Sequence, residues 1–137
     1  MPRLTFAALE GYLRGYIDLV FEHGGRYYVL DWKSNHLGYA QQDYAEERVA
    51  AAMQEHGYHL QYLLYSVAVH RYLGQRIAGY DYAKHFGGVL YLFVRGVRPG
   101  WRDAQGGPLG TWFHRVPEAT LASLDALLAG LPKAVAA

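Results

Sequence analysis

A pair of adjacent glycines constrains the fold of this chain more than any other feature of its sequence. Gly24-Gly25 separates two runs, 16–23 and 26–33, in which apolar and polar residues alternate as they do in β-strands. Two consecutive glycines supply the positive φ angles that a two-residue hairpin turn requires. The segment is therefore predicted to form an antiparallel hairpin in which residue 23 pairs with residue 26 and residue 18 with residue 31.

This register places charged residues of both strands on one face of the hairpin. Asp18 and Asp31 become cross-strand neighbours, with β-carbons about 5 Å apart. Lys33 lies two residues beyond Asp31 and shares its face. The opposite face carries only apolar and aromatic side chains and is predicted to be the core face: Ile17, Leu19, Phe21, Tyr28, Leu30 and Trp32. One extra residue in the turn would move Asp18 to that opposite face.

Two carboxylates this close repel each other, so either one of them binds a proton or a cation lies between them. Mg²⁺ suits such a position because it prefers oxygen ligands and keeps several waters. Lys33 could hold an attacking water or offset the negative charge of a phosphate. The alternative interpretation is a solvated face on which Lys33 neutralises one aspartate, and a lone Asp-x-Lys would favour that alternative.

Composition and charge limit the classes of function. A chain of 137 residues with 52% hydrophobic and 18% charged residues is predicted to be one globular domain. Its net charge of +1 means that nucleic acid would have to be bound through a local patch. The absence of cysteine excludes disulfides, thiolate zinc sites and iron–sulfur clusters. No apolar run approaches the ~20 residues of a membrane span, and we expect no membrane contact.

The rest of the sequence predicts helices packed on a sheet. Strands are predicted over residues 4–22 and 26–33, a buried strand over 87–96 and an edge strand over 111–116. Helices are predicted over 44–56 and 58–76, divided at Gly57, and a final helix over 117–130. In the helix 58–76 the leucines, Leu60 among them, are expected to face the core. The segment 79–88 reads as a turn. This order of elements predicts α/β or α+β layers with a mixed sheet.

Four segments together resemble a known family. They are GYIDLVF, YYVLDWKSN, YHLQYLLYSVAVHRYL and HFGGVLYLFVRG, in this order between Gly11 and Gly96. They resemble the C-terminal nuclease domains of RecB type, from the beta subunits of exonuclease V, in the PD-(D/E)XK nuclease superfamily. The resemblance implies an α/β, restriction-endonuclease-like core, in which a mixed β-sheet with an antiparallel hairpin is flanked by helices.

The resemblance also implies roles for the charged residues of the hairpin. Asp18 and Asp31 correspond to the metal ligands and Lys33 to the catalytic lysine of the family, and the backbone carbonyl of Trp32 would be a further ligand. The implied cofactor is Mg²⁺, and Mn²⁺ or Ca²⁺ would be able to occupy the same site.

A second motif of this nuclease branch, Gln-x-x-x-Tyr, matches Gln61 and Tyr65, which the resemblance adds to the catalytic residues. Their spacing places both side chains on one face of the helix 58–76. A polar amide and a phenol on a leucine-rich helix could point at the charged end of the hairpin. The residues alone favour another interpretation, a partly buried tyrosine with a hydrogen-bonded hydroxyl.

The function implied by the resemblance is Mg²⁺-dependent hydrolysis of DNA by an exodeoxyribonuclease of exonuclease V type, in DNA end processing and recombinational repair in the cytoplasm. The implied partners are DNA, mainly single-stranded, the other subunits of a RecBCD-type complex and a recombinase. A non-catalytic docking module for a partner subunit or the recombinase is the alternative. The chain has no Walker-type glycine loop, so an ATP-driven motor would lie elsewhere.

The chain departs from the family pattern at its beginning. Family domains carry helices before the first strand, and one of them supplies a histidine that helps to hold the metal. The seven histidines of this chain do not occupy that place: His23, His36, His56, His59, His70, His85 and His114. We therefore expect residues 1–137 to be a single nuclease-core domain from a larger helicase-nuclease subunit, truncated on its N-terminal side. By itself it is expected to cleave DNA weakly or not at all.

Overall fold

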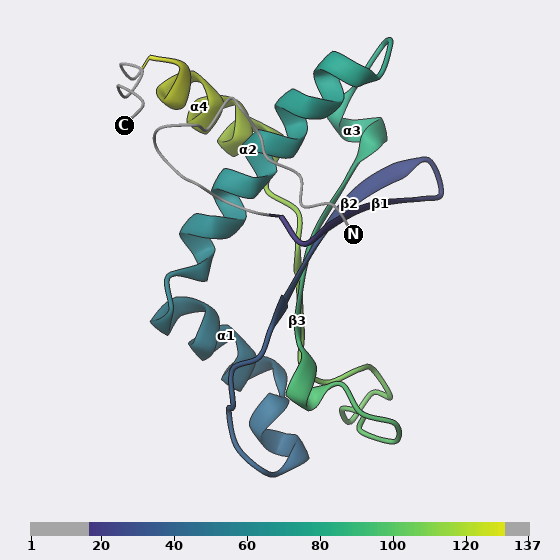
Figure 1. Cartoon of the computed structure of the whole chain (residues 1–137), viewed down its shortest axis with the longest axis vertical. Coiled ribbons are helices and arrows are strands. Elements are labelled where there is room, and N and C mark those ends of the chain that lie inside the picture. The colour runs from purple at the N-terminus through teal and green to yellow at the C-terminus, as the bar shows by residue number, and fades with distance from the viewer. Residues whose placement is uncertain (1–16, 131–137) are drawn as a thin grey trace.

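The fold is a four-stranded mixed β-sheet with helices packed against it (Figure 1). The computed structural model describes residues 17–130. The strands lie side by side in chain order: β1 (Leu19–His23), β2 (Arg26–Lys33), β3 (Phe86–Phe93) and β4 (Thr111–His114). The helices are η2 (Gln41–Tyr44), α1 (Glu46–Glu55), α2 (Tyr58–Arg76), α3 (Tyr82–His85), η3 (Val94–Gly96) and α4 (Glu118–Ala129). The predicted α/β class with a mixed sheet is confirmed.

The hairpin β1–β2 has the predicted register. Gly24 and Gly25 have φ angles of 60° and 79°, which the turn requires and which side chains with a Cβ rarely adopt. Leu19 pairs with Leu30 and His23 with Arg26. Of the expected long first strand, the structure describes β1, whereas residues 4–16 lie outside the described residues.

A parallel pair of strands forms the centre of the sheet. The chain leaves β2, passes through α1, α2 and α3, and returns as β3, which pairs with β2 in parallel. Strand β4 then pairs with β3 in antiparallel orientation and forms an edge, as predicted. In Figure 1 the helices α1, α2 and α4 all lie on one side of the sheet. This crossover brings α2 over the end of β2 that carries the charged residues.

The helices follow the predicted bounds, with three differences. The strand predicted over 87–96 ends at Phe93, and its last three residues form the 3₁₀ helix η3. The first helix begins at Glu46 because residues 41–44 form the separate 3₁₀ helix η2, which ends in the buried Tyr44. A short helix, α3, replaces the turn expected before β3, and its N-terminus is capped by the Asp81 carboxylate, which accepts a bond from the Ala83 N–H at 3.1 Å. None of the helices within residues 17–130 combines the length and apolar character needed to cross a membrane.

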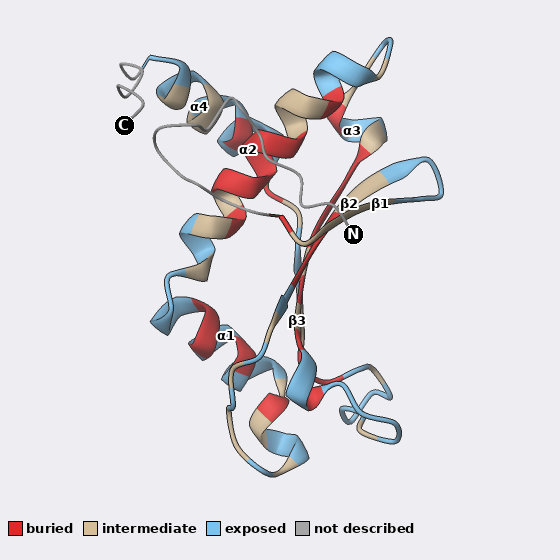
Figure 2. Ribbon diagram, viewed as in Figure 1, coloured by how far each residue is buried: buried red, intermediate tan, exposed pale blue. Residues whose placement is uncertain are grey.

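The buried side of α2 differs from the prediction. Leu64 is buried, but Leu60 is 60% exposed. Eleven of the nineteen positions of this helix are apolar residues or tyrosines, and they are not confined to one face, so helical spacing does not identify the buried side. The residues that pack inward include three with polar atoms, Tyr62, Tyr65 and Ser66. Figure 2 shows that buried residues occur along both α2 and β3.

The prediction for the core face of the hairpin was wrong. Val29 is fully buried and Asp31 is 3% exposed, so the face that carries the charges is the one packed under α2. Of the six residues predicted to form the core face, Ile17 and Leu30 are buried, but Trp32 is 48% exposed. Both faces of the hairpin carry apolar side chains, and alternation alone does not say which of them a helix will cover.

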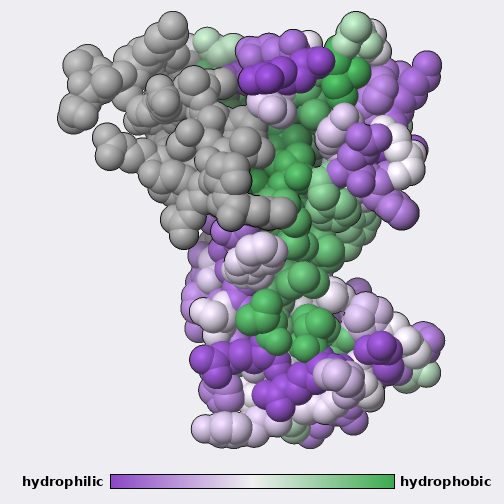
Figure 3. Space-filling model, turned by 45° about the vertical axis from the view of Figure 1, so that its right-hand side comes forward, coloured by the Kyte–Doolittle hydropathy of each residue, from purple (hydrophilic) through white to green (hydrophobic). Residues whose placement is uncertain are grey.

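The second face of the sheet is an open face, on which no described helix packs. It carries Trp32 and Phe113, which is 54% exposed, together with the half-buried Leu90 and Leu92. Figure 3, which looks toward this side, shows apolar side chains gathered in a continuous band. Tyr28 and Phe113 lie on the same face with ring centroids 6.3 Å apart.

Candidate active site

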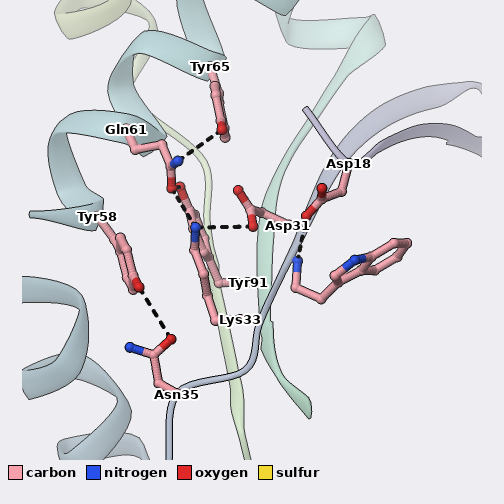
Figure 4. A network of polar contacts seen from close by, with 9 residues as sticks. Asp18, Asp31, Lys33, Asn35, Tyr58, Gln61, Tyr65 and Tyr91 are labelled. Atoms are coloured by element: carbon pink, nitrogen blue, oxygen red, sulfur yellow. Dashed lines mark hydrogen bonds and ion pairs between the residues drawn. The ribbon is translucent and has the colours of Figure 1, made fainter. Parts of the chain in front are cut away.

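The charged residues of the hairpin meet beneath α2, as the register predicts. Residue 18 directly precedes β1, and the Asp18 carboxyl lies beside that of Asp31, with which it forms a side-chain hydrogen bond (Figure 4). A carboxylate oxygen of Asp18 accepts a hydrogen bond from the backbone N–H of Trp32 at 3.1 Å. The ammonium of Lys33 forms an ion pair with Asp31 at 3.2 Å. Two carboxylates and one ammonium therefore occupy one small region at the end of β2.

Burial dominates the electrostatics of Asp31. The pKa of this carboxyl is raised to about 6, and loss of solvation is the largest cause. The ammonium of Lys33 lowers the pKa, whereas the charge and hydrogen bonding of Asp18 raise it. One ammonium therefore does not compensate for burial and the second carboxylate together. In this environment the ionised form of Asp31 gains from a further positive charge.

Gln61 links the charged pair to the tyrosines around it. Its Oε1 accepts hydrogen bonds from Lys33 at 3.0 Å and from the Tyr91 hydroxyl at 2.9 Å. Its Nε2 donates to the Tyr65 hydroxyl at 2.9 Å. Because an ammonium has no acceptor, only the oxygen of the amide can face Lys33, which fixes the orientation of Gln61. The two motif residues on α2 thus contact the charged end of the hairpin.

The tyrosine hydroxyls of the site remain protonated. Burial raises the pKa of Tyr65 above its ordinary value, and the negative charges of Asp31 and Asp18 and a hydrogen bond with Asp31 raise it further. Burial likewise raises the pKa of Tyr91, with Asp31 as the next cause. Both phenols therefore act as neutral hydrogen-bond donors beside the carboxylates.

Sequence reasoning missed three residues of this cluster, Tyr58, Asn35 and Tyr91. The Tyr58 ring lies beside Lys33, and its hydroxyl donates to the Asn35 side chain at 3.2 Å. Tyr58 is one helical turn before Gln61, so helical spacing could have indicated it. Tyr91 lies in the almost continuous apolar run of β3, where no local signal distinguishes it.

The carboxylates suit a hard divalent cation. Asp18 and Asp31 offer oxygen donors from the two arms of the hairpin, and because burial raises the pKa of Asp31 to about 6, a positive charge beside it would favour its ionised form. Mg²⁺ is commonly bound through one or two carboxylates and several waters, so two are sufficient. Within residues 17–130 no group of three or more His, Cys, Asp and Glu side chains is arranged to hold a metal. The carbonyl of Trp32 as a further ligand stays a prediction.

A model of a protein family matches most of the chain, and this match does not depend on the geometry of the site. Residues 3–127 match the model of the PD-(D/E)XK nuclease superfamily. This range includes both strands of the hairpin, helix α2 and the central strand β3. The match therefore covers every residue of the cluster described above.

Curated relatives are similar to the chain over much of its length. The RecB subunit of the RecBCD enzyme from Escherichia coli (strain K12) is 50% identical over 130 residues, which are 95% of this chain and 11% of that protein. The RecB subunit from Mycolicibacterium smegmatis is 43% identical over 126 residues, which are 88% of this chain and 12% of that protein. The chain thus spans about a tenth of the length of these relatives.

Proposed function

The chain belongs to the PD-(D/E)XK nuclease superfamily, and we propose that it hydrolyses phosphodiester bonds of DNA with Mg²⁺ as cofactor. The observation that carries this proposal is the cluster of Asp18, Asp31 and Lys33, held together beneath α2 and bonded to Gln61. A structural ion pair would need one carboxylate, whereas this cluster brings a second one beside the first. The raised pKa of Asp31 supports a role in holding a cation.

In this proposal Asp18 and Asp31 would hold the metal ion, with the backbone carbonyl of Trp32 as a further ligand. When bound, such an ion lowers the pKa of a coordinated water and offsets the charge that develops on the phosphate. Lys33 would direct its ammonium at the attacking water or at a non-bridging phosphate oxygen. Water adds to phosphorus, the bond to the leaving sugar oxygen breaks, and that oxygen takes up a proton.

The two motif residues on α2 would act through Lys33 and Asp31. Gln61 accepts a hydrogen bond from the ammonium and so restrains the direction in which its remaining N–H bonds point. Tyr65 bonds to Gln61 and contributes to the environment of Asp31. Neither side chain has an acidic or basic group suited to proton transfer at neutral pH, so we assign them positioning roles.

We propose further that the chain is part of a larger helicase-nuclease subunit of exonuclease V type that processes DNA ends in recombinational repair. The support is its similarity to a tenth of the RecB subunits. Single-stranded DNA would be the main substrate. Other subunits of a RecBCD-type complex and a recombinase would be the partners. Processing of chromosomal ends would place the protein in the cytoplasm. Backbone contacts would suffice for DNA that is fed in without sequence preference.

A docking function is the second candidate, and the open face favours it. Trp32 and Phe113 are about half exposed on an otherwise apolar surface, and aromatic side chains are common anchors in protein interfaces. The two candidates differ in whether removal of the carboxylates matters. A docking module would keep its function without Asp18 and Asp31.

The experiment assays cleavage of single-stranded DNA in Mg²⁺ by the chain alone and by the E. coli RecB subunit carrying the chain in place of its matching segment. We expect weak cleavage by the chain alone and stronger cleavage by the hybrid. Asp31→Ala and Asp18→Ala should each abolish cleavage by the hybrid, and Glu47→Ala, at an exposed position on α1, should not. Full cleavage by the hybrid with Asp31→Ala would refute the proposed site.

A further inference from the structure

Two tyrosine rings lie next to the ammonium of Lys33. Its Nζ lies 4.2 Å from the centroid of the Tyr58 ring and 5.4 Å from that of Tyr91. The rings are nearly parallel, with centroids 6.0 Å apart and an interplanar angle of 16°. They come from different elements, since Tyr58 opens α2 and Tyr91 lies in β3. Figure 4 shows Lys33 among these side chains and Gln61.

Both rings are themselves fixed by further contacts. The Tyr58 hydroxyl donates to Asn35 at 3.2 Å, and the His56 ring stacks on Tyr58 with centroids 5.4 Å apart. Tyr91 is fully buried, and its hydroxyl donates to the same Gln61 oxygen that accepts from Lys33. The ring faces are therefore held in place independently of the ammonium.

The contacts of Lys33 divide into two kinds. Asp31 and Gln61 accept hydrogen bonds from the ammonium, which leaves one of its three N–H groups for a further partner. The ring faces attract the charge without taking up that N–H group. A lysine has a flexible stem of four carbons, and a small misplacement of a reacting group can cost about a hundredfold in rate.

We propose that Tyr58 and Tyr91 form an aromatic slot that positions Lys33 for the reaction, so that both are positioning residues of this site. The catalytic consequence rests on the proposed nuclease function. The slot itself is a property of the ring faces, so removal of the Tyr58 hydroxyl should be tolerated and removal of its ring should not. Tyr58 is the better residue to test because it is only half-buried, whereas loss of Tyr91 would also disturb the core.

The first readout is independent of activity. A proton above an aromatic ring resonates upfield, so the ε-methylene signal of Lys33 should lie upfield of that of the exposed Lys84 in a ¹³C–¹H spectrum of the chain. The chain contains only three lysines, and Lys33→Arg identifies the signal. Tyr58→Phe should keep the upfield position, and Tyr58→Leu should move the signal toward that of Lys84. An unshifted Lys33 signal in the unsubstituted chain would overturn the slot.

The second readout is cleavage of single-stranded DNA in Mg²⁺ by the hybrid subunit, which carries either the unsubstituted chain or one of its variants. Tyr58→Leu should lower kcat about tenfold, the loss expected from one cation–π contact of a largely desolvated ammonium. KM should stay nearly unchanged, and Tyr58→Phe should cleave within about twofold of the unsubstituted chain, because its ring face remains. Tyr39→Leu is the control, since Tyr39 is 92% exposed and contacts His36 away from Lys33.

The outcomes separate the slot from the proposed function. Equal cleavage by Tyr58→Leu and the unsubstituted chain would overturn the positioning role, although the nuclease function would stand. A loss of cleavage in Tyr58→Phe as large as in Tyr58→Leu would overturn it too, because the hydroxyl rather than the ring would then matter. If the hybrid with the unsubstituted chain does not cleave, the proposed function is in question, and the position of the Lys33 signal alone decides for or against the slot.

Discussion

Each of the two faces of the β-sheet carries some residues that its surroundings would not favour. On the covered face, beneath α2, Val29 and Phe93 are fully buried and Asp31 is only 3% exposed. On the open face Trp32 and Phe113 are 48% and 54% exposed. Ionisable groups are rarely buried unless they are paired, and large aromatic groups are rarely left at the surface in a contiguous patch.

The difference between the faces shows how burial changes the pKa of a carboxyl group. A carboxylate on the open face would be hydrated and would titrate near its ordinary value. Beneath α2 the same group loses hydration, and its pKa rises to about 6. Such a carboxylate gains more from a bound cation than a solvated one does. In the proposed function, burial under a helix that supplies Gln61 and Tyr65 would therefore let two ordinary aspartates hold a metal ion.

The largest expected effect concerns chemistry on the covered face. Lys33→Met keeps the length of the side chain but removes the charge, and it should lower cleavage of single-stranded DNA at least about a hundredfold, as loss of a preorganised charge at a reacting phosphate does. Phe113→Ala, on the open face, should leave kcat within about threefold, since substitutions away from a site rarely change its chemistry. The measurement is kcat of both variants in the hybrid subunit. Equal losses in the two variants would remove the functional distinction between the faces.

The next effect concerns stability. Phe93 is fully buried on the covered face, and Phe93→Ala should lower the free energy of unfolding by about 3–5 kcal/mol. Phe113→Ala should lower it by about 1 kcal/mol or less, because half of the ring remains in solvent. Urea denaturation of the chain checks both values. A cost for Phe113→Ala as large as that for Phe93→Ala would mean that the open face is covered in solution.

A smaller effect concerns pH. The pKa of Asp31 is raised from 3.8 to about 6 on folding, so the folded state holds the proton more tightly than the unfolded state. Its contribution to stability is therefore present below about pH 4 and is lost as the pH rises through about 6. The stability of the unsubstituted chain minus that of Asp31→Asn should fall on the order of 2 kcal/mol over this interval in metal-free buffer.

Magnesium provides the control for this pH dependence. A cation beside Asp31 and Asp18 favours their ionised forms, so the fall in stability between about pH 4 and 6 should become smaller in Mg²⁺. Denaturation curves at several pH values, with chelator and with Mg²⁺, give the comparison. A difference that rises with pH in chelator would contradict the raised pKa of Asp31.

The sequence predicts the hairpin better than it predicts the surroundings of the hairpin. A two-residue Gly-Gly turn leaves one register, so the pairing around Asp18 and Asp31 could be read from spacing alone. The face that α2 covers could not be predicted from spacing, because both faces of the hairpin carry apolar residues. Which face a helix covers depends on the path of the chain between β2 and β3. The place of Tyr91 in the site could not be predicted for a related reason, since β3 is apolar on both faces.

The smallest expected effect separates a positioning hydroxyl from a merely structural one. Tyr65 and Tyr62 are both buried on α2, 4% exposed each. The Tyr65 hydroxyl accepts from Gln61 at 2.9 Å, whereas the Tyr62 hydroxyl bonds to His114 at 2.7 Å, away from the carboxylates. Tyr62→Phe should lower the free energy of unfolding by about 1 kcal/mol, the typical worth of one hydrogen bond, and Tyr65→Phe by about 1–3 kcal/mol, because its hydroxyl bonds to both Gln61 and Asp31.

Cleavage should respond to only one of these two substitutions. Without the Tyr65 hydroxyl, Gln61 keeps its contacts to Lys33 and Tyr91 but loses the partner of its NH₂ group, so its amide is less firmly oriented and kcat should fall about three- to tenfold. Tyr62→Phe should cleave as the unsubstituted chain does. The test measures kcat and the midpoint of urea denaturation for both variants, so that an effect on cleavage can be told from an effect on stability. If kcat falls equally in both, the loss reflects weaker packing of α2, and Tyr65 has no separate part in placing Lys33.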